Sequence, residues 1–185
     1  QQPSYLVGMG MPGLPGIMVG RNEHVSWGAT YTFMDTVDSW VEDCCNGQYR
    51  KGDSWCDFSV RKETVKRKKG QSIELYFYEN EHGVLAGNPK ETGRFLATRW
   101  MAADSGAASL MAGLKMGAFT NAKEAMKALG AIESAWNWVI ADSGNNIAYQ
   151  MSGLMPQRNP KWNGFEPAPG WDAGFDWQGT VDVND

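Results

Sequence analysis

Apolar and polar positions alternate along several short stretches of this 185-residue chain, which is the period expected of β-strands. Residues 72–78 alternate most cleanly and are predicted to form a half-buried strand. Residues 17–19 and 24–30 are short apolar runs separated by a polar turn, which predicts a hairpin. Residues 136–140 and 147–151, again separated by polar residues, predict a second hairpin.

The pattern changes between residues 104 and 129, where Ala, Leu, Met and Lys favour helix. Asn121 followed by Glu124 resembles a capping box, and Gly130 stands where a helix would end, so two helices are predicted here. The tail from residue 156 onward is rich in Pro, Gly and Trp and is predicted to be loop. Strands, helices and strands in this order, without a visible repeat or linker, predict a single α+β unit.

Composition and charge exclude several function classes. The formal net charge is −4, whereas nucleic-acid-binding proteins usually carry a basic surface, so no nucleic-acid partner is expected. The one basic run, residues 61–69, is interpreted as a solvated strand or turn. The chain has no run of 18 apolar residues, so no membrane span is expected. Its first residues do not resemble a signal peptide, so any export signal is expected to have been removed.

Cysteines and histidines are too few for most metal and triad sites. Cys56 is expected either to form one local disulfide, with Cys44 or Cys45, or to be a small buried thiol like them. His24 and His82 are the only histidines, so a Ser-His-Asp triad would need one of them, and a three-histidine metal site is impossible. A structural or surface role is favoured for both.

Three further features have two interpretations each. The segment 8–13 matches the dinucleotide motif G-x-G-x-x-G, but the prolines that follow cannot open a helix, so nucleotide binding is not favoured. Asp35 and Asp38 follow a predicted strand and suit a Ca²⁺ ion, although their spacing alone favours a turn or helix cap. The nine tryptophans and the methionines near the first hairpin either line an apolar acyl pocket or form plain core.

Several blocks of residues together carry a resemblance to a known family. They are Pro12–Asn22, Val25–Thr30, Asp35–Asp38, Arg61–Val65, His82–Gly83, Trp136–Trp138, Ala141–Ile147, Ser152–Gly153 and Asp176–Gly179. Together they resemble an internal part of the β chain of the penicillin acylase family of N-terminal nucleophile (Ntn) amidohydrolases. The resemblance implies an α+β fold in which residues 1–185 are part of a four-layer αββα sandwich with antiparallel sheets.

The resemblance also implies a reaction and a site. In this family a Ser at the start of the β chain, exposed by self-cleavage of a zymogen, attacks an amide carbonyl with its own α-amino group as base. The backbone N–H of the oxyanion hole falls at Tyr31, and the acyl pocket draws on Met18, Val19, Phe33 and Trp136. The implied substrate is an amide of an acyl group with a polar amine, such as a β-lactam antibiotic, an acyl-homoserine lactone or a lipopeptide.

A structural Ca²⁺ ion is a further implication of the resemblance. Its ligands would be Asp35, the carbonyl of Val37, Asp38 and the carbonyl of Gly164, a position that is often proline in the family. No organic cofactor is implied. The resemblance also implies a periplasmic or secreted location.

Two parts of the family's machinery are missing from the chain. Residue 1 is Gln, and the oxyanion-hole Asn would follow the end of the chain. Both the nucleophile and that Asn are therefore expected from other segments of the same precursor, which are the α chain and the Ser-bearing β N-terminus. The alternative is a non-catalytic module derived from this fold that binds an acyl or aromatic ligand.

Overall fold

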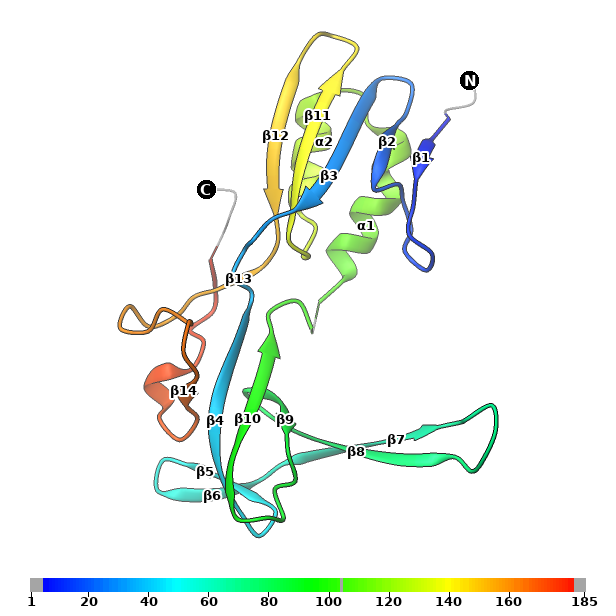
Figure 1. Cartoon of the computed structure of the whole chain (residues 1–185). Coiled ribbons are helices and arrows are strands. Elements are labelled where there is room, and N and C mark those ends of the chain that lie inside the picture. Colours follow the sequence, from blue (N-terminus) through cyan, green and yellow to red (C-terminus); the bar gives the residue numbers. More distant parts are fainter. Residues whose placement is uncertain (1–4, 104, 182–185) are drawn as a thin grey trace. The chain divides into compact units, whose positions relative to one another are not determined.

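The computed structural model describes residues 5–103 and 105–181, and it divides the chain into two compact units (Figure 1). The first unit comprises Gln1–Thr36, Met101–Met155 and Thr180–Asp185, and the second comprises Val37–Trp100 and Pro156–Gly179. The sequence predicted a single α+β unit, whereas contacts within the chain group it into these two units. Alternation along a sequence identifies strands, but it does not determine which strands pair in the same sheet.

The first unit contains an antiparallel sheet with strand order β1-β2-β3-β11-β12. The strands are β1 (Val7–Met9), β2 (Val19–Arg21), β3 (Val25–Tyr31), β11 (Trp136–Asp142) and β12 (Ile147–Ser152). Both predicted hairpins are present, as β2–β3 and β11–β12. β3 and β11, which are far apart in the sequence, pair along their whole lengths at the centre of the sheet.

The two predicted helices are present as α1 (Ala107–Lys115) and α2 (Ala122–Gly130), with a short 3₁₀ turn, η1 (Met116–Ala118), between them. The Asn121 side chain accepts a hydrogen bond from the Glu124 N–H at 2.9 Å, which confirms the predicted N-cap. Alternate residues of β3 and β11 pack with these helices in a core of Val25, Trp27, Ala112, Met116, Phe119, Ala122, Ala125, Leu129, Ile132, Trp138 and Ile140. No helix in the described ranges is long and apolar enough to cross a membrane.

The turn between β2 and β3 is tied to η1 by the buried side chain of Asn22. Its Oδ1 accepts from the N–H groups of His24 and Val25, each at 2.8 Å. Its Nδ2 donates to the carbonyls of Met116 at 3.1 Å and Phe119 at 2.8 Å. One amide therefore satisfies four backbone groups, which gives a physical reason for an Asn after Gly-Arg in this turn.

The second unit is built on another sheet, with strand order β6-β5-β4-β10-β9-β8-β7. The strands are β4 (Val37–Cys45), β5 (Gln48–Lys51), β6 (Ser54–Asp57), β7 (Ser59–Val65), β8 (Ile73–Asn80), β9 (Gly83–Ala86) and β10 (Gly93–Trp100). The tail from residue 156 is mostly loop, as predicted, with η2 (Ala173–Phe175) and β14 (Ala168–Pro169), which lies parallel to β4. Two short strands, β13 (Met155–Pro156) and β15 (Thr180–Val181), complete the described elements.

Strands β7 and β8 extend from the second unit as a two-stranded arm (Figure 1). β8 confirms the predicted strand, but Ile73 and Leu75 are 43% and 40% exposed, so the expectation of a half-buried strand was wrong for this part of it. Only a third strand or a helix could bury that face, and the described residues place neither there. The basic run 61–69 lies on β7 and the following turn, and β7 is exposed throughout.

The structure also decides two smaller alternatives. All three cysteines are free, and Tyr49 stands between Cys44 and Cys56 in the register of β4, β5 and β6, so the local disulfide is not formed. Burial raises the pKa of the Cys44 thiol to about 11, with the charge of Glu42 adding to the effect, so this thiol is protonated and unreactive. The glycines of the G-x-G-x-x-G match lie on β1 and a turn, and no helix follows them.

Asn22→Asp is predicted to destabilise the first unit by about 2 kcal/mol or more, because the buried carbonyls of Met116 and Phe119 would lose their donor. The measurement is the hydrogen-exchange protection of the β2–β3 turn and η1. Asn145→Asp, at an exposed turn position, is the control and should change protection little. Equal protection in the two variants would contradict the role given to Asn22.

Candidate functional site

The residue assigned to the oxyanion hole, Tyr31, is the last residue of β3 and lies opposite Trp136, the first residue of β11. The two rings stack with their centroids 4.6 Å apart and an interplanar angle of 20°. The Tyr31 side chain is 70% exposed. Sequence reasoning named both residues, and the β3–β11 pairing brings them into contact.

The direction of the Tyr31 N–H follows from the hydrogen-bond pattern of this ladder. The Thr32 N–H donates to the Ala135 carbonyl at 3.4 Å, so Tyr31 and Trp136 form a non-hydrogen-bonded pair. The residue pair at the other end of the ladder is also a non-hydrogen-bonded pair. In such a pair the backbone N–H of Tyr31 points away from β11, to the side of β3 on which β2 pairs with the N-terminal half of the strand, while the Tyr31 carbonyl accepts from Asn137 Nδ2 at 3.0 Å. The Tyr31 N–H therefore points to the edge of β3, beyond the residues that pair with β2.

The residues assigned to the acyl pocket divide into two groups. Met18 and Trp136 are partly buried and pack against the core of the first unit. Val19 is 43% exposed, and Phe33 is fully exposed. Met18 and Trp136 therefore pack against the core, whereas Val19 and Phe33 present apolar surface to solvent.

A second group of buried polar residues lies in the second unit and was largely missed by sequence reasoning. Alternation along β4 places Asp38, Trp40, Glu42 and Cys44 on its buried face. The Asp38 carboxylate is satisfied by residues that are distant in the sequence, whereas only Oε1 of Glu42 is hydrogen-bonded and its buried Oε2 has no partner among the described residues. Acidic residues recur at alternating, buried positions of this strand, and that pattern in the sequence could have revealed them.

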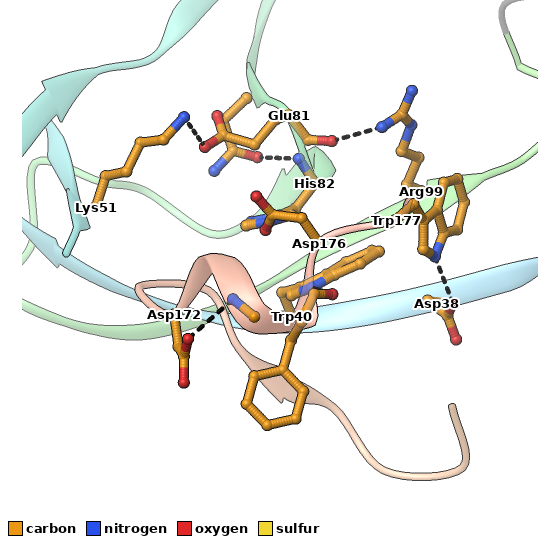
Figure 2. Close-up of polar contacts among 12 residues, drawn as sticks. Asp38, Trp40, Lys51, Glu81, His82, Arg99, Asp172, Asp176 and Trp177 are labelled. Atoms are coloured by element: carbon orange, nitrogen blue, oxygen red, sulfur yellow. Dashed lines mark hydrogen bonds and ion pairs between the residues drawn. The ribbon is translucent and has the colours of Figure 1, made fainter. Parts of the chain in front are cut away.

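Asp38 is held by an arginine and a tryptophan of the C-terminal tail. Arg158 Nε donates to Asp38 Oδ2 at 2.7 Å, and an Nη donates to Oδ1 at 3.2 Å. Trp177 Nε1 donates to Asp38 Oδ2 at 2.6 Å, as Figure 2 shows. The Asp38 side chain is fully buried and that of Arg158 is 13% exposed, so this is a buried, bidentate ion pair.

The residues implied as calcium ligands do not fit that ion in this arrangement. A cation on the Asp38 carboxylate would face the positive charge of Arg158 at contact distance. Asp35 is exposed, and Val37 is half-exposed. No group of three His, Cys, Asp or Glu side chains in the described part of the chain is placed to hold a metal ion. The buried ion pair also replaces the turn or helix cap that spacing alone favoured for Asp38.

Glu42 is hydrogen-bonded through Oε1 to His82, which is buried and structural as one interpretation expected. His82 Nδ1 lies 2.6 Å from Glu42 Oε1, and its Nε2 lies 2.9 Å from Asp176 Oδ1. Trp40 stacks on the imidazole with centroids 4.6 Å apart. Burial alone would lower the pKa of His82, but its hydrogen bonds to the two carboxylates outweigh burial and raise the pKa above 6.5. The geometry therefore favours the protonated imidazole more than free histidine does, because its two ring nitrogens each face a carboxylate oxygen.

The Asp176 end of this cluster opens onto a cleft of about 470 Å³ in the second unit. Lys51 and Glu81 also line the cleft and form an ion pair of 2.7 Å, which Figure 2 shows beside His82. Burial of the Glu81 carboxyl would raise its pKa, but hydrogen bonds from Lys51 and Tyr49 lower it below the ordinary value. The Lys51 and Glu81 charges therefore neutralise one another, while the lining as a whole has more acidic than basic side chains.

Comparison with known proteins identifies one family. Its model, described as penicillin amidase, matches residues 3–185. The acyl-homoserine lactone acylase QuiP of Pseudomonas putida is 27% identical over 96% of this chain, and penicillin G acylase of Escherichia coli is 28% identical over 97%. The chain spans only 22% and 23% of the lengths of these two relatives.

A solved structure shows the same fold. The thermostable penicillin G acylase from Alcaligenes faecalis matches 98% of this chain with a TM-score of 0.83 and 23% sequence identity. The match covers 35% of that chain. The mostly β architecture with two helices therefore corresponds to part of a larger acylase fold.

His82 is predicted to make the attachment of residues 170–179 dependent on pH. Because its pKa is raised on folding, its ionic contacts are fully present below pH about 6.5 and are lost as the pH rises through the raised value. Hydrogen-exchange protection of this segment, corrected for intrinsic rates, should fall over that range. His82→Gln should lower protection at pH 6 roughly tenfold or more, because Glu42 would be buried without its cation.

His24→Gln is the matched control, since His24 is half-exposed and far from this cluster in the sequence. It should leave the protection of residues 170–179 unchanged at every pH. Wild-type protection that does not change between pH 6 and the alkaline range would contradict the assigned role of His82.

Proposed function

The chain belongs to the penicillin amidase family, and from that premise we propose that it works as a section of an enzyme that hydrolyses acyl amides. The substrate class is an amide between an acyl group and a polar amine, such as a β-lactam antibiotic, an acyl-homoserine lactone or a lipopeptide. The observation that carries the proposal is the Tyr31 N–H, which points to an edge of β3 beside a stacked aromatic pair.

The proposed chemistry uses a nucleophile from another segment of the polypeptide, the Ser at the start of the β chain. Its oxygen forms a bond to the amide carbonyl carbon while its proton passes to the α-amino base. The carbonyl π electrons move to the oxygen, and the Tyr31 N–H donates a hydrogen bond to that oxyanion. When the oxyanion collapses, the C–N bond breaks and the amine leaves with the proton. Water then releases the acyl group from the Ser.

The exposed apolar surface of Val19 and Phe33 supports the assignment of Met18, Val19, Phe33 and Trp136 to acyl binding. Exposure of a whole phenylalanine ring is unfavourable in water, and burial against an acyl chain and the rest of the enzyme would remove that cost. An Asn from another segment would supply the second oxyanion donor, and the α chain would close the pocket.

The four-layer sandwich is also part of the proposal. One face of the first unit's sheet is covered by helices, whereas Val139, Ile147 and Tyr149 on the other face are 58%, 83% and 60% exposed. A second sheet from the remaining polypeptide would cover this face and complete the αββα layers. We also propose the periplasmic or secreted location that the family resemblance implies.

An amide-to-ester replacement at Tyr31 tests the oxyanion donor, because it removes the N–H and keeps the side chain. In the complete enzyme it should lower kcat by about 10²–10³ for an acyl-amide substrate. Tyr31→Ala keeps the N–H and should retain most of kcat. The same ester replacement at Ala29, two residues earlier on β3, is the matched control. Equal losses at the two positions would contradict the role of Tyr31.

Phe33→Ala tests whether Phe33 contacts the acyl group, and it leaves the core undisturbed because the ring is fully exposed. Loss of its contact with the acyl group should lower kcat/KM about tenfold or more, mainly by raising KM. Phe165→Ala is the control, because Phe165 is 86% exposed and belongs to the second unit. Kinetics that are identical in the two variants would argue against Phe33 as a substrate contact.

A further inference from the structure

We propose that the guanidinium of Arg158 is the resident counter-ion of Asp38 and takes the place of the calcium ion that the family resemblance implies. The second unit then folds and holds its C-terminal tail without a divalent metal. This inference concerns Asp38 and its neighbours in the second unit, and it holds whether or not the chain is part of an amidase.

The first argument is charge. Asp38 is fully buried, and a buried carboxylate needs a cation and hydrogen-bond donors close to it. Arg158 provides both, with two hydrogen bonds in the forked geometry that suits a carboxylate, and Trp177 supplies a third donor. A metal ion on the same carboxylate would have to displace the guanidinium or approach it against like-charge repulsion.

The second argument is the backbone at Gly164. Its φ of +79° lies in the left-handed region, which favours glycine. A Cβ at Gly164 would lie 2.7 Å from Asp38 Oδ1 and 2.8 Å from Arg158 Nε, so the glycine leaves room for the ion pair. The glycine and the arginine are thus parts of the same arrangement.

The third argument is the second buried carboxylate of the same strand. Glu42 lies four residues along β4 from Asp38, on the same buried face, and its Oε1 lies 2.6 Å from His82 Nδ1. Both carboxylates also connect β4 to the C-terminal tail, Asp38 through Arg158 and Glu42 through His82 and Asp176. The C-terminal tail is thus attached to β4 at two points, through Arg158 and through His82 with Asp176.

The test uses hydrogen exchange of residues 37–45 and 156–179 in the complete protein that contains this chain. Excess EGTA should leave the protection of both segments unchanged in the wild type. Arg158→Gln should make exchange in residues 156–179 roughly tenfold faster or more, because Asp38 remains buried and charged. Lys161→Gln, an exposed position of the same tail, is the control and should have no effect.

The double variant Asp38→Asn with Arg158→Gln separates charge from packing. If Arg158 acts as a counter-ion, removal of both charges should restore most of the protection lost in Arg158→Gln. No recovery would overturn the counter-ion role. Faster wild-type exchange in EGTA, reversed by added Ca²⁺, would overturn the proposal directly, as would unchanged protection in Arg158→Gln.

Discussion

The first unit depends on the pairing of β3 with β11. This ladder joins segments on either side of the helices, and its alternate residues, including Trp27, Trp138 and Ile140, form the core against α1 and α2. The same ladder brings Tyr31 opposite Trp136 and turns the Tyr31 N–H away from its partner strand. Register therefore determines both stability and the proposed oxyanion site, because a shift of one residue would reverse the direction of every backbone group and side chain.

The second unit solves a different problem, which is the burial of charge. Asp38 and Glu42 lie on the buried face of β4 together with Trp40, and each would destabilise the unit if it had no cation. Arg158 pairs with Asp38, which also accepts a hydrogen bond from Trp177. His82 lies between Glu42 and Asp176 and is hydrogen-bonded to both. The irregular tail is thus attached by specific polar contacts, although it contains little regular secondary structure.

Local patterns in the sequence predicted the local structure well. Both hairpins, both helices and the Asn121 cap follow from periodicity and capping chemistry, which depend on neighbouring residues. The division into two units and the exposure of β8 could not be predicted, because they depend on which strands pair. The Arg158–Asp38 pair joins residues 120 positions apart, so no local pattern could identify it. Tyr31 was named through family resemblance, and its role as oxyanion donor stays a prediction.

The most direct test of the proposed function is a crystal structure of the complete enzyme with its nucleophile trapped as a tetrahedral adduct of a phosphonate analogue. The account predicts that the adduct oxygen in the oxyanion position lies about 2.7–3.1 Å from the backbone nitrogen of Tyr31. It also predicts that the acyl group contacts the stacked rings of Tyr31 and Trp136. An oxyanion held entirely by other donors, with the Tyr31 N–H bonded elsewhere, would contradict it.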